Sequence, residues 1–216
     1  AILIREGEEI NTLIMTFHHI AFDGWSVGIF MNELKSFYSE QKNFNKIGES
    51  PLPIQFGDYA NWQREQLQGN AYEKKIDFWK TKLRGIQPIS LAKSNLNPDI
   101  NAITGHTQAF LVPEKVSKQL TEIANNTGTT LYMVLMATFK TLLYQLTEKT
   151  DLCIGTVVAD RQFQHTDKMV GYFINTLPIR SKLNPNNSFL DFLAEVKFNC
   201  LEAFEYQDVP FEKIVA

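Results

Sequence analysis

The sequence has few cysteines and lacks the marks of a membrane-spanning or nucleic-acid-binding protein. Only Cys153 and Cys200 occur in 216 residues, both inside apolar patterns. We therefore expect buried free thiols of a cytoplasmic protein, with a disulfide as the less favoured alternative. No apolar run reaches about eighteen residues, which excludes a helix long enough to cross a bilayer. The net charge of −3 gives no reason to expect a nucleic acid or an anionic membrane as partner.

Several catalytic motifs are also missing. The chain has no glycine-rich phosphate loop, no dinucleotide fingerprint, no metal-ligand spacing, no Gly-x-Ser-x-Gly turn and no internal repeat. Its hydrophobic content of 44% is sufficient for the core of one good-sized domain or two small ones. The start, Ala1–Arg5, does not resemble a signal peptide, because Arg5 interrupts the apolar run. Both ends lie in sequence typical of regular structure, so we expect a fragment of a longer polypeptide.

Two adjacent histidines follow an apolar run near the start of the chain. Asn11–Phe17 predicts a buried strand that delivers His18 and His19. Successive strand side chains point to opposite faces, so we expect one histidine to face a site and the other to pack. Asp23 and Gly24 then predict a tight turn, in which Gly24 is free to take a positive φ.

This histidine pair allows three interpretations. Both side chains can be satisfied core or strand-end residues, which is the common case for adjacent histidines. His18, His19 and Asp23 can instead be metal ligands, but adjacent strand histidines diverge and no further ligand lies at a suitable spacing. In the third interpretation one histidine is a general acid or base and Asp23 fixes the local geometry. The unperturbed pKa of an imidazole suits proton transfer near neutrality.

The rest of the chain alternates between helical and strand patterns, which indicates an α/β sandwich. Ser26–Tyr38 predicts a helix capped by Ser26, and a second helix is expected near Ala71–Leu83. Gly85–Ala102, rich in Pro, Asn and Ser, is the best linker. Further on we expect a strand at His106–Val112, followed by a helix that Pro113 opens and Gly128 ends. A largely buried helix should begin at Thr130. We then expect strands at Leu152–Ala159 and Gly171–Arg180, and a last helix capped by Ser188 and Asp191. The expected core face of the buried helix is Leu131, Val134, Leu135, Thr138, Leu142 and Leu146.

The string Phe17–Ser26 resembles the His-His-x-x-x-Asp-Gly signature of the condensation domains of nonribosomal peptide synthetases. Other strings fall in the order of further motifs of that family. They are Asp58–Gln63 (fourth), Phe78–Leu83 (end of the N-terminal lobe), Ile154–Arg161 (fifth), Gly171–Leu177 (sixth) and Tyr206–Glu212 (seventh). The chain departs from the usual residues of these motifs at three positions. Pro is common where this chain has Val157, Gly or Asn where it has Asp160, and His where it has Tyr206. It is identified as a member of this family over almost its whole length.

The resemblance implies two α/β lobes, each similar to chloramphenicol acetyltransferase, with the active site in a tunnel between them. Residues 1–93 would be the C-terminal part of the N-lobe, and residues 94–216 an incomplete C-lobe. The implied reaction is amide formation between substrates that donor and acceptor carrier proteins present on phosphopantetheine. An adenylation domain is expected in the same polypeptide. No metal and no directly bound cofactor are expected, because the donor thioester is already activated.

The resemblance also implies roles for single residues. His19 is the candidate to accept the proton of the attacking amine or to position that amine. The backbone N–H of Gly24, at a helix N-terminus, is a candidate donor to the oxyanion. His18 is expected to be structural. Asp23 is expected to fix the turn through a buried ion pair with Arg161, although Arg161 can also be a surface strand-end residue.

Three further residues, Trp25, Ser26 and Asn175, are candidates for the tunnel wall; Asn175 can equally form a strand-end hydrogen bond. His106 and His165 receive no role. Epimerization domains share the signature but typically continue Asp-Gly-Val-Ser-Trp, whereas this chain continues with Trp and Ser. Heterocyclization domains replace both histidines with Asp. A stand-alone acyltransferase of the same superfamily and a non-catalytic domain that binds carrier proteins stay open as alternatives.

Overall fold

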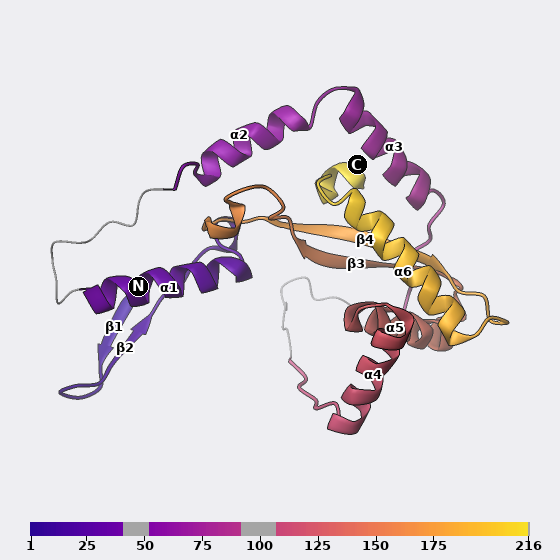
Figure 1. Ribbon diagram of the computed structural model, residues 1–216, viewed down its shortest axis with the longest axis horizontal. Helices are drawn as coiled ribbons and strands as arrows, with labels where there is room; N and C mark the ends of the chain where they lie inside the picture. Colours follow the sequence, from indigo (N-terminus) through magenta and orange to yellow (C-terminus); the bar gives the residue numbers. More distant parts are fainter. Residues whose placement is uncertain (41–51, 92–106, 216) are drawn as a thin grey trace, which may run out of the picture. The chain divides into compact units, whose positions relative to one another are not determined.

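The computed structural model describes residues 1–40, 52–91 and 107–215 of the chain. Its helices and strands follow one another in the order β1, β2, η1, α1 to α5, β3, η2, β4, α6, α7, where η1 and η2 are short 3-10 helices (Figure 1). They belong to two compact units. The first comprises Ala1–Lys75, Val157–Thr176 and Asp208–Ala216, and the second comprises Ile76–Thr156 and Leu177–Gln207. The expected lobe boundary between residues 93 and 94 lies outside the described residues and stays a prediction.

The first unit begins with an exposed two-stranded sheet. β1 (Ile2–Arg5) pairs antiparallel with β2 (Asn11–Ile14), with Ile2 opposite Ile14. Ile2 is 62% exposed and Leu3, on the opposite face, is 68% exposed. The prediction of a buried strand through residue 17 is therefore wrong. Apolar alternation predicts a strand, but burial depends on what covers it, and no described element covers both faces of this hairpin.

A helical turn and a long helix follow the histidine pair. η1 covers His19–Ala21 and α1 covers Gly24–Glu40. Asp23, not Ser26, caps α1, because Asp23 Oδ1 accepts the N–H of Ser26 at 2.8 Å. The positive φ expected at Gly24 is not observed, since this residue is the first of the helix.

An aromatic core forms around α2 in the first unit. α2 (Phe56–Gln66) contributes Tyr59, which is buried with Met169 and Phe173. Phe56, Trp62 and Phe163 pack around these three as partly buried neighbours. A Cβ atom added at Gly171 would lie 2.4 Å from the Phe56 ring, so this position accepts only glycine without a shift of the ring.

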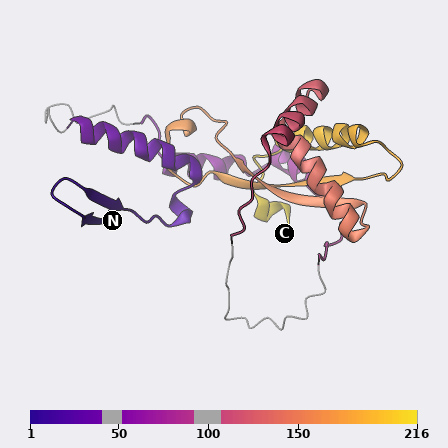
Figure 2. The same ribbon diagram turned by 90° about the horizontal axis from the view of Figure 1, so that it is seen from below.

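The second unit contains most of the longer helices. α5 (Leu131–Thr147) packs against both α4 (Glu114–Thr127) and α6 (Phe189–Glu205) (Figure 2). β3 (Asp151–Ala159) and β4 (Ile174–Lys182) pair in a two-stranded sheet and continue into the first unit. α3 (Asn70–Leu83) likewise begins in the first unit, and the short α7 (Phe211–Ile214) belongs to the first unit. Both cysteines are free thiols, as expected, but only Cys200 is buried; Cys153 is half-buried.

Two sequence predictions fail in this unit. Residues 107–113 form no regular structure, so the strand expected up to Val112 is wrong for its described part; His106 lies outside the described residues. Of the face predicted for α5, only Val134 is buried, whereas Leu142 is 47% and Leu146 67% exposed. The buried face is instead Met133, Val134, Met136, Ala137, Lys140 and Leu143. α5 is apolar on two faces, and periodicity alone does not choose between them.

The buried face of α5 includes a lysine. Lys140 is 0% exposed, and its Nζ donates to the Ile179 carbonyl at 2.8 Å and to Ser181 Oγ at 2.7 Å. Burial lowers the pKa of this ammonium group to about 8. A charged residue on the core face of a helix breaks the apolar pattern that the prediction followed.

Local end signals of the helices were predicted correctly. Gly128 ends α4 in the left-handed conformation, with a φ of 59°. Ser188 and Asp191 form a reciprocal capping box at the start of α6: Ser188 Oγ accepts the Asp191 N–H at 3.2 Å, and Asp191 Oδ2 accepts the Ser188 N–H at 3.0 Å.

Replacing Ser188 with alanine removes one half of this capping box. We expect the free energy of unfolding to fall by roughly 1 kcal/mol, the usual loss for an N-cap serine. Urea unfolding followed by circular dichroism measures the change. Ser117→Ala, within α4, is the matched control and should leave stability equal or slightly higher because alanine favours helix interiors. Equal stability of the two variants would contradict a contribution from the cap.

Candidate active site

The turn after the histidines is held by a buried carboxylate. Asp23 is 2% exposed and lies just before α1. Its Oδ1 accepts the N–H of Ser26, its Oδ2 accepts the N–H of Phe173 at 3.1 Å, and its own N–H donates to the Gly171 carbonyl at 3.2 Å. The start of α1 is thereby fixed to the loop that precedes β4.

Arg161 completes this network from the end of β3. Its Nη2 lies 2.9 Å and 3.0 Å from the two carboxylate oxygens of Asp23, and the two side chains are only 3% and 1% exposed. Its Nη1 donates to the carbonyls of Thr166 and Met169. The guanidinium also stacks 4.0 Å above the ring of Phe173. The expected ion pair is present, and Arg161 is not the surface residue of the alternative interpretation.

Hydrogen bonds decide the charge state of this carboxylate. Burial alone would raise the pKa of Asp23, but hydrogen bonds from the Ser26 hydroxyl and backbone, the Phe173 backbone and Arg161 outweigh it. The pKa of Asp23 is therefore lowered from its ordinary value of 3.8. Asp23 is an anion at neutral pH, and both its oxygens are engaged in structure rather than directed at a substrate.

Ser26 belongs to this network and not to a tunnel wall. It is 0% exposed, and its hydroxyl lies 2.7 Å from Asp23 Oδ1 and 3.0 Å from both the carbonyl and the N–H of Gly171. The prediction that Ser26 lines a substrate tunnel is wrong, because a saturated, buried hydroxyl has no open side.

His19 lies beside a pocket within the first unit. The pocket has a volume of about 540 Å³ and is lined by His19, Ile20, Val157, Tyr172, Ile174 and Thr176. The His19 imidazole is exposed and meets the Tyr172 ring edge-on, with ring centroids 5.5 Å apart. This arrangement leaves an imidazole accessible to a molecule in the pocket while one aromatic ring limits its movement.

His18 has a local structural position. Its side chain is exposed, and its Nδ1 accepts the N–H of Ile20 at 3.1 Å, which caps η1. The expectation that one histidine packs in a core is therefore wrong. β2 ends at Ile14, so the alternation of side chains along a strand does not apply to the histidines. Their side chains diverge because His18 caps the helical turn η1 and His19 is its first residue.

The other predicted residues lie around these two. Gly24 begins α1, so its N–H has no partner four residues earlier in the helix. Trp25 is 53% exposed, and its Nε1 donates to the Asp167 carbonyl at 3.0 Å. Asn175 Nδ2 donates to the Val209 carbonyl at 2.7 Å, and its Oδ1 accepts the N–H of Phe211 at 3.0 Å. The hydrogen bond expected as one alternative for Asn175 is therefore present, and because Asn175 also lines a cavity of about 190 Å³, its place on a tunnel wall stays a prediction.

Sequence reasoning missed two residues of the site. Tyr172, beside His19, and Gly171, which bonds Asp23 and Ser26, both lie in the string that resembles the sixth motif. That string was the available signal, but nothing in residue type or spacing linked it physically to the histidines. Among the described residues, no three His, Cys, Asp or Glu side chains gather in a way that could hold a metal. No described helix is long and apolar enough to cross a membrane.

Comparisons with known proteins cover the whole chain. The family described as Condensation domain matches residues 1–216. A linear gramicidin synthase polypeptide of Brevibacillus parabrevis is 40% identical over 218 residues, covering 100% of this chain and 4% of that protein. Phosphinothricin tripeptide synthetase PhsC of Streptomyces viridochromogenes is 34% identical, covering 99% of this chain and 20% of that protein. The chain thus spans a small part of the curated relatives it matches.

Solved structures give the same fold for about half of their length. The X-domain from teicoplanin biosynthesis superposes with a TM-score of 0.82 at 29% identity, covering 91% of this chain and 45% of that one. The first condensation domain of the calcium-dependent antibiotic synthetase superposes with a TM-score of 0.74 at 20% identity, covering 90% and 44%. The expected α/β fold class is confirmed.

Replacing Asp23 with asparagine leaves Arg161 as a buried charge without its counterion. We expect the free energy of unfolding to fall by roughly 3 to 5 kcal/mol at pH 7, the range for breaking a buried ion pair. Chemical unfolding measures it, with the exposed Asp77→Asn as a control for the same chemical change.

The pH dependence of this loss separates the effect of the Asp23 charge from the effect of the shape of its side chain. The folded-state pKa of Asp23 is lowered, so its contribution is present above its ordinary pKa of 3.8 and is lost as pH falls further. The difference between wild type and Asp23→Asn should therefore shrink below about pH 4. A difference that is constant down to pH 2 would show that the charge of Asp23 is not what stabilises the fold.

Proposed function

Because the chain belongs to the condensation-domain family of nonribosomal peptide synthetases, an acyltransferase family whose substrates are carrier-bound thioesters, we propose that it contributes an amide-forming site to such a synthetase. In this reaction the α-amino group of an acceptor aminoacyl thioester attacks the carbonyl carbon of a donor acyl or peptidyl thioester. The new C–N bond forms, the C–S bond breaks, and the donor thiol leaves on its carrier. Donor and acceptor carrier proteins are the partners, with an adenylation domain in the same polypeptide and the cytoplasm as the compartment.

The single observation that carries this proposal is the exposed imidazole of His19 beside a pocket of about 540 Å³. An α-amino group has an ordinary pKa near 8, so it must lose a proton before or during attack. His19 accepts that proton or holds the amine in the orientation for attack. The Tyr172 ring, edge-on to the imidazole, restricts the directions in which His19 can turn.

The surrounding network supports a positioning role for the charged residues next to His19. Asp23 is engaged by Ser26, Phe173 and Arg161 and has no oxygen left for a substrate proton. We assign Asp23 and Arg161 to holding the turn between His19 and α1. The N–H of Gly24 lies in the first turn of that helix, where unpaired N–H groups and the helix dipole favour a developing oxyanion. Phosphopantetheine arrives with the carriers, so the chain needs no cofactor of its own for this step.

A second candidate function is docking without catalysis. A solved complex of an X-domain and OxyB from teicoplanin biosynthesis has a TM-score of 0.81 and 30% identity to this chain. That X-domain is in a complex with another protein, so this fold also provides binding surfaces. Exposed aromatic residues near the site, such as Trp25 at 53% exposure, would suit a protein partner. The position of His19 on the wall of a pocket favours the catalytic proposal.

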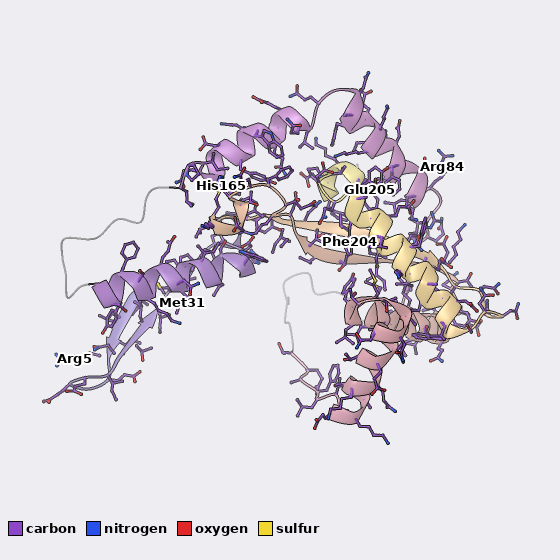
Figure 3. All side chains as sticks on the ribbon, in the orientation of Figure 1. Arg5, Met31, Arg84, His165, Phe204 and Glu205 are labelled. Atoms are coloured by element: carbon purple, nitrogen blue, oxygen red, sulfur yellow. The ribbon has the colours of Figure 1, made fainter. Side chains whose placement is uncertain are left out.

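Replacing His19 with alanine tests the proposed chemistry. In a synthetase module that contains this chain, with both carriers loaded, we expect dipeptidyl-thioester formation to fall roughly 10²- to 10⁴-fold, the range for loss of a general base. Rapid-quench mass spectrometry of the carriers measures product. His165→Asn is the control, at the residue labelled in Figure 3 that immediately precedes η2 (Thr166–Lys168). His165 has a φ of 70°, a conformation that asparagine tolerates.

Three other outcomes would redirect the assignment. Unchanged product in His19→Ala would remove this residue from the chemistry. Carrier binding without product in the wild type would support the docking function. Exchange of an α-proton on the loaded residue, again without condensation, would indicate epimerization.

A further inference from the structure

Another cavity in the first unit shares no lining residue with the His19 pocket, although a third cavity of about 190 Å³ is lined by residues of both, Asp160 and Tyr172 among them. The cavity apart from the His19 pocket has a volume of about 250 Å³, and Tyr59, Trp62, Tyr72, Asp160, Phe163 and Asp208 are among its walls. We call it the Asp160 cavity. We propose that it binds a primary alkylammonium ion, with the charged group against Asp160 and the alkyl chain against the aromatic rings. This inference does not rest on amide formation.

Buried oxygens without partners are the first support. Asp160 is 4% exposed, its Oδ2 lies a long 3.5 Å from the Tyr59 hydroxyl, and its Oδ1 has no hydrogen-bond partner among the described residues. Within the same described ranges, Asp208 Oδ1 and the Tyr72 hydroxyl also have none. Buried polar atoms are almost always paired, and a buried carboxylate is costly without a donor. The three residues that carry these oxygens all line the cavity, and an ammonium group supplies three N–H donors.

Charge selects a cation over an anion or a neutral molecule. The cavity wall carries two carboxylates, Asp160 and Asp208, and one ammonium group, that of Lys75. Lys75 Nζ pairs with Asp208 Oδ2, so its charge is already engaged. With both carboxylates ionised, one negative charge remains. A single monovalent cation neutralises it.

The aromatic walls select an organic cation over a metal ion. The rings of Tyr59, Trp62 and Phe163 form a cluster, with Trp62 and Phe163 centroids 4.2 Å apart and Tyr59 and Trp62 centroids 5.8 Å apart. Ring faces attract ammonium ions and bury alkyl groups. The described residues here supply too few ligand side chains for a metal. The volume corresponds to about eight water molecules of ~30 Å³ each, enough for a short alkylamine.

Titration of Asp160 gives the site a pH dependence. Burial and the charge of Asp208 raise the pKa of Asp160 to about 6. The other titratable groups around it are Tyr59 from α2, Tyr72 and Lys75 from α3, Asp208, and Glu212 from α7, which lines an adjoining cavity with Asp160. Burial and the charge of Asp160 raise the pKa of Tyr59 above its ordinary value of 10.0, so this phenol stays neutral. Binding requires ionised Asp160, and affinity should fall about tenfold per pH unit below 6.

The test uses n-butylammonium chloride as the probe, titrated into the chain by calorimetry at constant ionic strength. We expect saturable binding that is about tenfold weaker at pH 5 than at pH 7.5, with the indole N–H signal of Trp62 shifting in nuclear magnetic resonance spectra. 1-Butanol, of the same shape but uncharged, should bind at least tenfold more weakly. Nα-acetyl-lysine amide separates two sources of the amine: binding equal to that of butylammonium indicates a residue side chain, and no binding indicates a free amine.

Asp160→Asn is the decisive variant. It should weaken butylammonium binding at least tenfold and abolish the pH dependence, whereas Asp167→Asn, an exposed acid of the same unit, should change neither. Circular dichroism checks that both variants fold. Carbon-13 titration of the Asp160 carboxyl gives a second readout: its pKa should fall when butylammonium is added. Equal binding of butanol, equal affinity in Asp160→Asn, or an unchanged pKa of Asp160 would overturn the proposal.

Discussion

The buried ion pair between Asp23 and Arg161 is the constraint on which the site depends. It joins the start of α1 to the end of β3, 138 residues later in the chain, and Phe173 and Gly171 add bonds from the loop before β4. Each partner also satisfies backbone groups, which offsets the cost of burying two charges. Removing either partner would leave the other charge buried. The ion pair therefore affects the site by holding the turn before α1 in place, and neither side chain is directed at a substrate.

His19 gains its position from this constraint without touching it. The residue lies four positions before Asp23, in the η1 turn that His18 caps. Asp23 fixes the turn after His19, and it also accepts the N–H of Phe173, the residue that follows Tyr172. These bonds hold the His19 imidazole beside the Tyr172 ring and the pocket that both residues line. An exposed side chain in a turn that buried hydrogen bonds hold in place combines access with a defined position.

The sequence predicted what is decided locally. Gly128 and the Ser188–Asp191 box follow from rules for helix ends, and they lie where expected. Burial was predicted poorly wherever it depends on distant partners: the N-terminal hairpin is exposed, and α5 buries Lys140 rather than its leucine face. The Asp23–Arg161 pair came from family resemblance rather than from physics, since no local pattern links residues so far apart. Tyr172 was missed for the same reason.

Arg161 follows Asp160 in the chain and forms an ion pair with Asp23. The carboxylates of Asp160 and Asp23 are both buried, yet they have opposite properties. Against the effect of burial, several donors hold the pKa of Asp23 below its ordinary value, so it is ionised at neutral pH. Asp160 has fewer donors, the distant Tyr59 hydroxyl and the Gln162 side chain, so burial and the like charge of Asp208 raise its pKa to about 6. The first carboxylate is already satisfied by the protein and has a structural role. The second lacks a counterion, so its charge state changes with pH and with any cation that reaches it. Burial is common to both, and the number of donors separates a structural carboxylate from a responsive one.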